Sequence, residues 1–448
     1  MTEFKVHIQE LLDLYDIKDC IIYNEKLVKL YKEIHRIVES GKTDEAVFNE
    51  LFNLIRGYDG PTPAELRAPK PGTLYTIRPV ADEETSNALQ VHVVEKKNNY
   101  STTEVYNATA IDNENNVDSR AAWIFDGNSI DADGFYYPAT GLNLRNIHTQ
   151  TNLSALGDDA TMLAEDIASI SLSPLGFCTT SFKVGEKYMA MNGTKITNAG
   201  GEKTQWIIEE IEEPEERIYY NVPSLSSAPL PDGKAYASLY LGFDARIPDG
   251  ITAWIVEDIL PNNQLVMIEV TGGIVPANTG LILSSKSDIK NQKFYYSATG
   301  STFNVDYNIL LGTTYTKIVD CSSQNVFMLG KKSDRIALYW TYENRDENGK
   351  KLTFDGTTNH NQGGFVMCNA NKSYLVEKDT SNEEAVSVYG FSFGGATTGI
   401  EEVGDEVKGD SGNVKTVYDL QGRRLVKVTS PGIYIVDGKK VYVTEIEE

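Results

Sequence analysis

Ala121-Ala-Trp-Ile-Phe125 returns later in the chain as Thr204-Gln-Trp-Ile-Ile208, and this echo is the strongest indication of how the chain folds. The strand-like segment Asp166-Ile-Ala-Ser-Ile-Ser-Leu172 lies midway between the two copies, which gives two periods of roughly 42 residues. Strand-turn-strand segments containing glycine fill the intervals, and the first unit opens at Gly72-Thr-Leu-Tyr-Thr-Ile77. This pattern predicts an all-β domain of three units over residues 73–213.

The three units resemble a ricin-type β-trefoil, the fold of many lectin domains. That family carries Gln-x-Trp near the end of each repeat, whereas this chain has Ala121-Ala122-Trp123 and Thr204-Gln205-Trp206. The Asp that holds sugar hydroxyls in the family is Asn143 or Met191 here. We therefore expect a trefoil core, with Trp123 and Trp206 as core anchors, that lacks the family's standard sugar sites. The candidate glycan-binding residues in this domain are Tyr136, Asn143, Tyr188 and Asn198.

Residues 1–57 have the period of amphipathic helices. Three apolar stripes, through Leu11 and Leu12, through Leu27 to Val38 and through Phe48 to Ile55, predict a three-helix bundle. The bundle is similar to helical spacer modules that separate domains in large secreted bacterial hydrolases. Residues 57–72 follow with four prolines, from Pro61 to Pro71, and are expected to form an extended, stiff linker.

Residues 216–395 form a second region of short alternating strands. Val275-Pro-Ala-Asn-Thr-Gly-Leu-Ile-Leu283 recurs as Cys368-Asn-Ala-Asn-Lys-Ser-Tyr-Leu-Val376, so the region has either two related halves or two equivalent strands in one sandwich. It is similar to β-sandwich accessory modules of secreted bacterial proteins. Residues 396–413 are Gly-rich and acidic, as expected of a linker.

Residues 414–448 predict two small hairpins. Strand-like Val417-Tyr-Asp-Leu420 and Ile433-Tyr-Ile-Val436 are each followed by a tight-turn pair, Gln421-Gly422 and Asp437-Gly438. The segment resembles the C-terminal sorting domain of proteins exported by the bacterial type IX secretion system. The resemblance implies a secreted or outer-surface bacterial protein that contacts the type IX secretion machinery through residues 416–443.

The composition is acidic. The net charge of −23 disfavours nucleic acid and anionic membranes as partners, because both would be repelled. No apolar run approaches the length of a membrane span, so we expect no membrane insertion. The opening Met1-Thr-Glu-Phe-Lys-Val-His7 lacks the features of a signal peptide. An export segment at one end without a signal peptide at the other suggests either a truncated chain or the C-terminal part of a longer protein. The four cysteines form no CxxC pair, and Cys321 with Cys368 is a candidate bridge.

The sequence contains no motif that predicts catalysis, a metal or a cofactor. The five histidines stand in separate segments, and His35 is expected to be a surface or boundary residue rather than a ligand. Asn128, Asp131 and Asp133 resemble a calcium loop, but their spacing does not match an EF-hand, and a turn is the default. Acidic residues come in solvated runs, and paired tyrosines suit sheet packing better than a sugar platform. We expect no enzyme activity from these residues.

Three functions remain open at this point. The first is a non-catalytic surface region whose modules bind a glycan or a host or surface protein. The second is the C-terminal accessory part of a large secreted hydrolase, a glycosidase or a protease, whose catalytic domain precedes Met1. The third is a structural adhesin or stalk segment.

Overall fold

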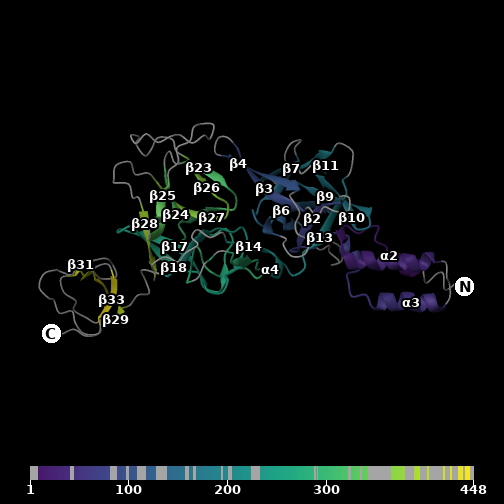
Figure 1. Cartoon of the computed structure of the whole chain (residues 1–448), viewed down its shortest axis with the longest axis horizontal. Helices are drawn as coiled ribbons and strands as arrows, with labels where there is room; N and C mark the ends of the chain where they lie inside the picture. Colours follow the sequence, from purple (N-terminus) through teal and green to yellow (C-terminus); the bar gives the residue numbers. More distant parts are fainter. Residues whose placement is uncertain are drawn as a thin grey trace.

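The protein is mainly β, as predicted, with few helices. A helical pair lies at one end, beside a first strand region, and a second strand region lies on the far side of the first (Figure 1). A computed structural model describes residues 9–40, 45–80, 88–96, 100–107, 118–127, 139–156, 161–164, 168–192, 195–199, 204–222, 233–286, 289, 291–320, 324–332, 335–341, 365–378, 388–393, 401–402, 417–418, 424–425, 432–436 and 439–443.

The described N-terminal residues include two long helices. Helix α2 (Glu25–Glu39) begins where the Asn24 side chain accepts a hydrogen bond from the Leu27 backbone N–H at 3.0 Å. Its apolar stripe is buried, and α3 (Glu45–Arg56) packs beside it with Val47 and Leu51 inward. Residues 9–14 are also helical. The helical period of this region is therefore confirmed over its described part.

The segment before α2 joins the helices to the first strand region. Its strand β1 (Ile22–Tyr23) runs parallel to β13 (Trp206–Glu210), with Ile22 opposite Ile208. Apolar residues from the helices and from the strands also belong to one buried cluster. The helices and the first strand region therefore share one core.

The proline-rich stretch after α3 is packed, and the prediction of an extended linker is wrong here. It contains a 3-10 helix, η1 (Pro63–Leu66), which starts at a capping box between Thr62 and Glu65. The Leu66 carbonyl accepts a hydrogen bond from the Ile21 N–H at 2.8 Å, and Leu66 is buried. Apolar side chains between the prolines are buried in the core. The free energy gained by this burial outweighs the preference of proline for extended backbone.

Six strands of the first region close into a barrel. Each strand pairs with the next in the order given, and the last pairs with the first. The six are β2 (Leu74–Pro79), β5 (Trp123–Asp126), β6 (Thr140–Asn146), β9 (Ile170–Gly176), β10 (Thr179–Val184) and β13.

Three hairpins stand between these barrel strands in the sequence. They are β3 (Leu89–Lys96) with β4 (Tyr100–Asn107), β7 (Asn152–Leu156) with β8 (Thr161–Ala164), and β11 (Lys187–Asn192) with β12 (Lys195–Ala199). Strand β4 pairs with β8 and with β12, which brings the three hairpins together. The twelve strands from β2 to β13 thus come in three sets of four. In each set the outer two strands belong to the barrel and the inner two form a hairpin.

The repeated tryptophans occupy matching places in two of these sets. Trp123 Nε1 donates to the Leu89 carbonyl at 2.9 Å, and Trp206 Nε1 donates to the Met189 carbonyl at 3.1 Å. Each bond runs from the last strand of a set to its hairpin, and both indoles are fully buried. Ile170 begins the last strand of the middle set. The interpretation of the two tryptophans as core anchors is confirmed.

The second region is a nearly closed barrel of nine strands, so the predicted β-sandwich is wrong. One sheet curls until its ends approach, and the Tyr240 N–H donates to the Asn371 carbonyl at 3.2 Å near this seam. The strand order is β15 (Ala235–Leu239), β20 (Leu281–Ser285), β17 (Ile251–Leu260), β18 (Gln264–Glu269), β28 (Val388–Phe393), β25 (Arg335–Thr341), β24 (Gln324–Lys332), β27 (Lys372–Lys378) and β22 (Leu310–Thr313).

This barrel consists of two related halves, as one interpretation of the recurring segment predicted. In the first half β15 pairs with β20, β20 with β17, and β17 with β18, while β16 (Ala245–Arg246) pairs with β19 (Ile274–Val275). The second half repeats this with β22, β27, β24 and β25, and with β23 (Lys317–Asp320) on β26 (Phe365–Cys368). Strand β28 lies between β18 and β25 and joins the halves.

The recurring Ala-Asn pair marks the same turn in both halves. Asn278 and Asn371 have positive φ angles of 54° and 58°, a conformation that asparagine tolerates better than most residues. Their N–H groups donate to the carbonyls of Leu241 and Thr313, both at 2.7 Å. The repeat was visible in the sequence because this turn restricts which residue can occupy it.

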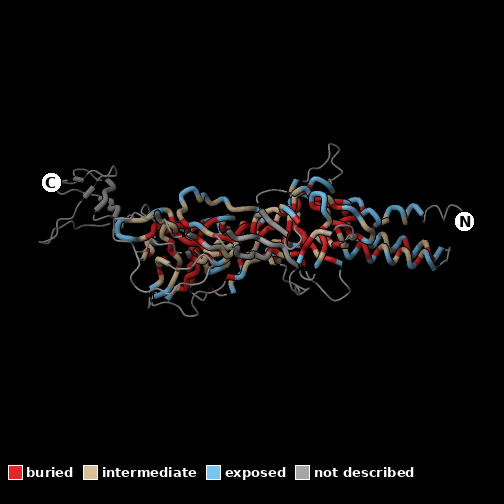
Figure 2. Tube along the Cα trace, turned by 90° about the horizontal axis from the view of Figure 1, so that it is seen from above, coloured by how far each residue is buried: buried red, intermediate tan, exposed pale blue. Residues whose placement is uncertain are grey.

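The two barrels meet over a shared apolar core. Ala122 and Ile147 of the first barrel belong to the same buried cluster as Ile218 and Phe243 of the second region. The short helix α4 (Pro214–Arg217) and the strand pair β14 (Tyr219–Asn221) with β21 (Lys293–Tyr295) lie on the second side of the junction. Buried segments run through the helical pair and both barrels in Figure 2. Packing, rather than a free linker, therefore joins these parts.

The C-terminal residues form a small sheet of their own. The predicted hairpins are confirmed: β30 (Val417–Tyr418) pairs with β31 (Arg424–Leu425), and β32 (Gly432–Val436) pairs with β33 (Lys439–Val443). Strands β30 and β32 pair with each other, and β29 (Glu401–Glu402) runs parallel to β33. The residues of both predicted turns lie outside the described part of the chain.

Candidate functional site

An open groove of about 600 Å³ lies between helix α2 and the turn that joins β9 to β10. Helix α2 and the residue after it supply one wall, and the turn supplies a single aromatic side chain. The lining residues are Tyr31, Lys32, His35, Arg36, Glu39, Ser40 and Phe177.

The turn holds Phe177 in an unusual conformation. Phe177 and Cys178 have φ angles of 51° and 55°, so both residues of this two-residue turn are left-handed. Hairpin turns of this kind favour Asn-Gly, and a bulky aromatic residue there is strained. Such strain persists only where surrounding contacts determine the backbone. The fully buried side chain of Cys178 makes these contacts, whereas the side chain of Phe177 is 58% exposed.

Three rings form the aromatic side of the groove. Phe177 meets Tyr31 edge to face at a centroid distance of 5.9 Å, and the His35 ring lies 4.2 Å from Tyr31 on α2. Burial, with smaller effects from Asp16 and Glu39, raises the pKa of Tyr31, so its hydroxyl stays protonated at neutral pH. The groove therefore offers a ring face together with a neutral hydroxyl.

Charged groups border these rings. The Arg36 guanidinium is oriented by Glu33, with an Nη2 to Oε1 distance of 2.6 Å and an Nε to Oε1 distance of 3.0 Å. Lys32 and Glu39 are exposed along the same wall. Exposed rings can stack on the apolar face of a flat ligand, and groups that donate and accept hydrogen bonds can bind its polar edge. This combination suits binding rather than proton transfer.

The glycan-binding residues predicted from the sequence do not line this groove. Asn143 lies in barrel strand β6, opposite Asp126, and Tyr136 lies outside the described residues. Tyr188 and Asn198 share the β11–β12 hairpin, but Tyr188 is opposite Ala199 whereas Asn198 is opposite Met189. Because neighbouring residues of a strand alternate between faces, Tyr188 and Asn198 point to opposite sides.

Sequence reasoning missed the groove because its two walls are far apart in the chain. The available signal was Gly176-Phe-Cys-Thr179, a large aromatic residue at a hairpin turn. His35, expected at a surface or boundary, is half-buried and faces the groove. His35 and Phe177 each meet the Tyr31 ring, and the second contact joins segments that are distant in the sequence.

A second arrangement looks catalytic but is structural. Ser119 Oγ lies 3.0 Å from His148 Nδ1, and Asp118 Oδ1 lies 3.2 Å from the same hydroxyl. In a catalytic triad the carboxylate bonds to the other histidine nitrogen, and here that nitrogen, Nε2, donates to the Thr314 carbonyl at 3.1 Å. Ser119 and His148 are both buried at the junction of the barrels, with no access for a substrate.

Within the described part of the chain, no group of three potential ligands could hold a metal ion. The calcium-like residues Asn128, Asp131 and Asp133 lie outside that part, as does Cys321 of the predicted bridge. Among the described helices, none has the length and apolar character needed to cross a membrane. No protein-family model matches the chain, and no curated protein matches it.

Proposed function

We propose that this chain is a non-catalytic, glycan-binding accessory region of a secreted or cell-surface bacterial protein. The observation that carries the proposal is the exposed Phe177 ring, which a strained turn holds against Tyr31 beside the charged groups of α2. Strain of about 1–3 kcal/mol at a surface residue is typical of positions maintained for binding. The ring face, the neutral hydroxyl and the guanidinium match the apolar face and the hydroxyl edge of a sugar.

Two further parts of the proposal concern architecture and export. We propose that residues 73–213 are a β-trefoil, which the three sets of four strands and the six-strand barrel support. We propose a three-helix bundle for residues 1–57, supported by Leu12 and Tyr15, which pack against the same core as α2 and α3. The paired hairpins of residues 414–448 support a sorting domain that the type IX secretion machinery reads.

The binding proposal is tested on the full chain with a panel of soluble glycans. Phe177→Asn removes the ring but keeps a residue that tolerates positive φ, so the turn is retained. We expect it to weaken glycan binding at least about tenfold, the loss of roughly one aromatic contact. Phe52→Ala is the matched control, because Phe52 is another exposed aromatic residue, 52% exposed, on α3 and outside the groove.

Two outcomes contradict the proposal. One is the absence of binding to every glycan of the panel. The other is binding that Phe177→Asn and Phe52→Ala change equally, which would place the contact elsewhere on the chain.

A structural stalk is the second candidate, and the packed junctions favour it. The helices share a core with the first barrel, and the first barrel shares one with the second, so the three parts form a stiff series. Such a region would hold a catalytic domain of a secreted hydrolase, or an adhesin, away from the cell surface. A shape in solution by small-angle scattering that is bent or variable between the barrels would count against a stalk.

A further inference from the structure

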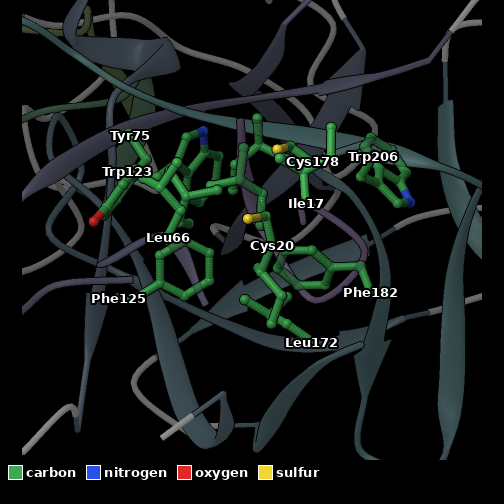
Figure 3. Packing of buried hydrophobic residues seen from close by; sticks show 14 of the residues in the cluster. Ile17, Cys20, Leu66, Tyr75, Trp123, Phe125, Leu172, Cys178, Phe182 and Trp206 are labelled. Atoms are coloured by element: carbon green, nitrogen blue, oxygen red, sulfur yellow. The ribbon is translucent and has the colours of Figure 1, made fainter. Parts of the chain in front are cut away.

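The fold brings together two cysteines from distant parts of the chain. Cys20 lies just before strand β1, and Cys178 is the second residue of the β9–β10 turn. Their side chains share a hydrogen bond, and strands β1 and β10 are in contact beside them. Figure 3 shows both sulfur atoms within the apolar cluster, with Trp123 and Trp206 on either side in that view.

The two thiols differ in their surroundings. Cys20 Sγ is 3.6 Å from the Pro63 carbonyl, to which it can donate, whereas Cys178 accepts hydrogen bonds from Cys20 and from the Asn24 backbone N–H. The bond to Cys178 and burial raise the pKa of Cys20, and the bond from Cys20 lowers the pKa of Cys178. Both side chains are fully buried in the folded chain, so their chemistry must be completed while the chain folds.

We propose that Cys20 and Cys178 form a disulfide when the chain folds in an oxidising compartment. The oxidant is a disulfide, either a small molecule such as glutathione disulfide or the active-site disulfide of a thiol oxidoreductase. The thiolate of one cysteine attacks a sulfur of this donor and releases the first donor thiol. The second thiolate then attacks the mixed disulfide and releases the other donor thiol. The cysteines lose two protons and two electrons, and the donor gains them.

The bond would connect the N-terminal segment to the turn that presents Phe177. It closes a long loop, and long loops lose the most freedom in the unfolded chain when they are cross-linked. Burial would also protect the bond from reductants in solution. The inference goes beyond the proposed function and stands even if no glycan binds.

The test uses the full chain, refolded in glutathione with its oxidised form and, in parallel, in a reducing buffer. After denaturation and alkylation of free thiols, non-reducing peptide mapping by mass spectrometry should find the Cys20 and Cys178 peptides linked as the main species. The melting temperature of the oxidised chain should exceed that of the reduced chain by roughly 5–10 °C. Cys178→Ser should remove both the linked peptide and the increase in melting temperature on oxidation. Cys368→Ser should remove neither.

Two results would overturn the inference. In one, the refolded chain yields Cys20 and Cys178 as alkylated free thiols or as glutathione adducts. In the other, the only linked peptide joins Cys321 to Cys368. Both readouts come from the unsubstituted chain, so the test holds even if a variant fails to fold.

Discussion

His148 of the first barrel donates a hydrogen bond from Nε2 to the carbonyl oxygen of Thr314 in the second, at 3.1 Å. A carbonyl can only accept, so the proton resides on Nε2, and Nδ1 is left to accept from the Ser119 hydroxyl 3.0 Å away. The neutral imidazole thus satisfies one partner on each side of the junction. Protonation would turn Nδ1 into a donor, so that the Ser119 hydroxyl would accept from it and donate to Asp118 Oδ1, 3.2 Å away, and a positive charge would be buried at the junction.

Stability should therefore fall in mild acid. Burial lowers the pKa of His148 below its ordinary 6.5. The positive charge of Arg120 lowers this pKa further, whereas the negative charge of Asp118 raises it. The unfolded chain takes up the proton first, so the contribution of His148 is complete above about pH 7.5 and is lost as the pH falls below 6.5. Urea unfolding of the wild type between pH 7.5 and 5 should show a slope of up to about 1.4 kcal/mol per pH unit from this group.

The variant His148→Asn isolates this effect from the other titrating groups. It should be less stable than the wild type at pH 7.5, and its stability should depend less on pH below 6.5. An unchanged pH slope in the variant would show that other groups cause the acid sensitivity.

Gly242→Ala should loosen the junction between the barrels. A Cβ at position 242 would overlap the carbonyl oxygen of His148, which is backbone and cannot rotate away. We expect a loss of about 1–3 kcal/mol in the free energy of unfolding, the usual cost of overpacking. Denaturant titration measures it, with Asp249→Ala, an exposed turn residue of the same region, as the control that should change little.

Phe177→Asn should leave the protein as stable as the wild type or make it more stable, by up to about 1 kcal/mol. The substitution replaces an aromatic residue, which is strained in the left-handed conformation, by one that tolerates it. It also removes the edge contact with Tyr31. Thermal unfolding measures the change. A clear loss of stability would mean that the ring supports the fold and is not kept for a ligand.

The two halves of the second barrel offer a matched pair of substitutions. Asn278→Ala and Asn371→Ala should each cost roughly 1 kcal/mol, because alanine resists positive φ. Asn278→Gly should recover most of this loss. Asn371→Gly should recover less, because Asn371 Nδ2 also donates to the Tyr240 carbonyl at 3.0 Å. If urea unfolding shows that glycine recovers the same free energy of unfolding at both sites, the hydrogen bond from Asn371 to Tyr240 does not contribute to stability.

The sequence was informative where a local constraint selects a residue. Trp123 and Trp206 repeat because each closes one set of strands through its indole N–H, and Asn278 and Asn371 repeat because each must adopt positive φ. The stripe of α2 and the strand pairs of the C-terminal hairpins follow from the same kind of local chemistry.

The sequence did not predict features that depend on which distant segments of the chain come together. The second region curls into a nearly closed barrel because distant strands such as β15 and β27 approach, and alternation along each strand is the same in a sandwich. The contact between Cys20 and Cys178 and the groove between α2 and Phe177 likewise join segments whose spacing carries no periodic signal.

The parallel pairing of Ile22 with Ile208 also sets the order of events when the chain is made. The segment that carries Ile22 is made well before the last strand of the first barrel, so it must wait for that strand before it finds its partner. Until then the apolar stripe of α2 lacks the part of its core that the barrel strands supply. Contacts of such long range fold slowly, so the N-terminal helices give the nascent chain a built-in delay before it becomes compact.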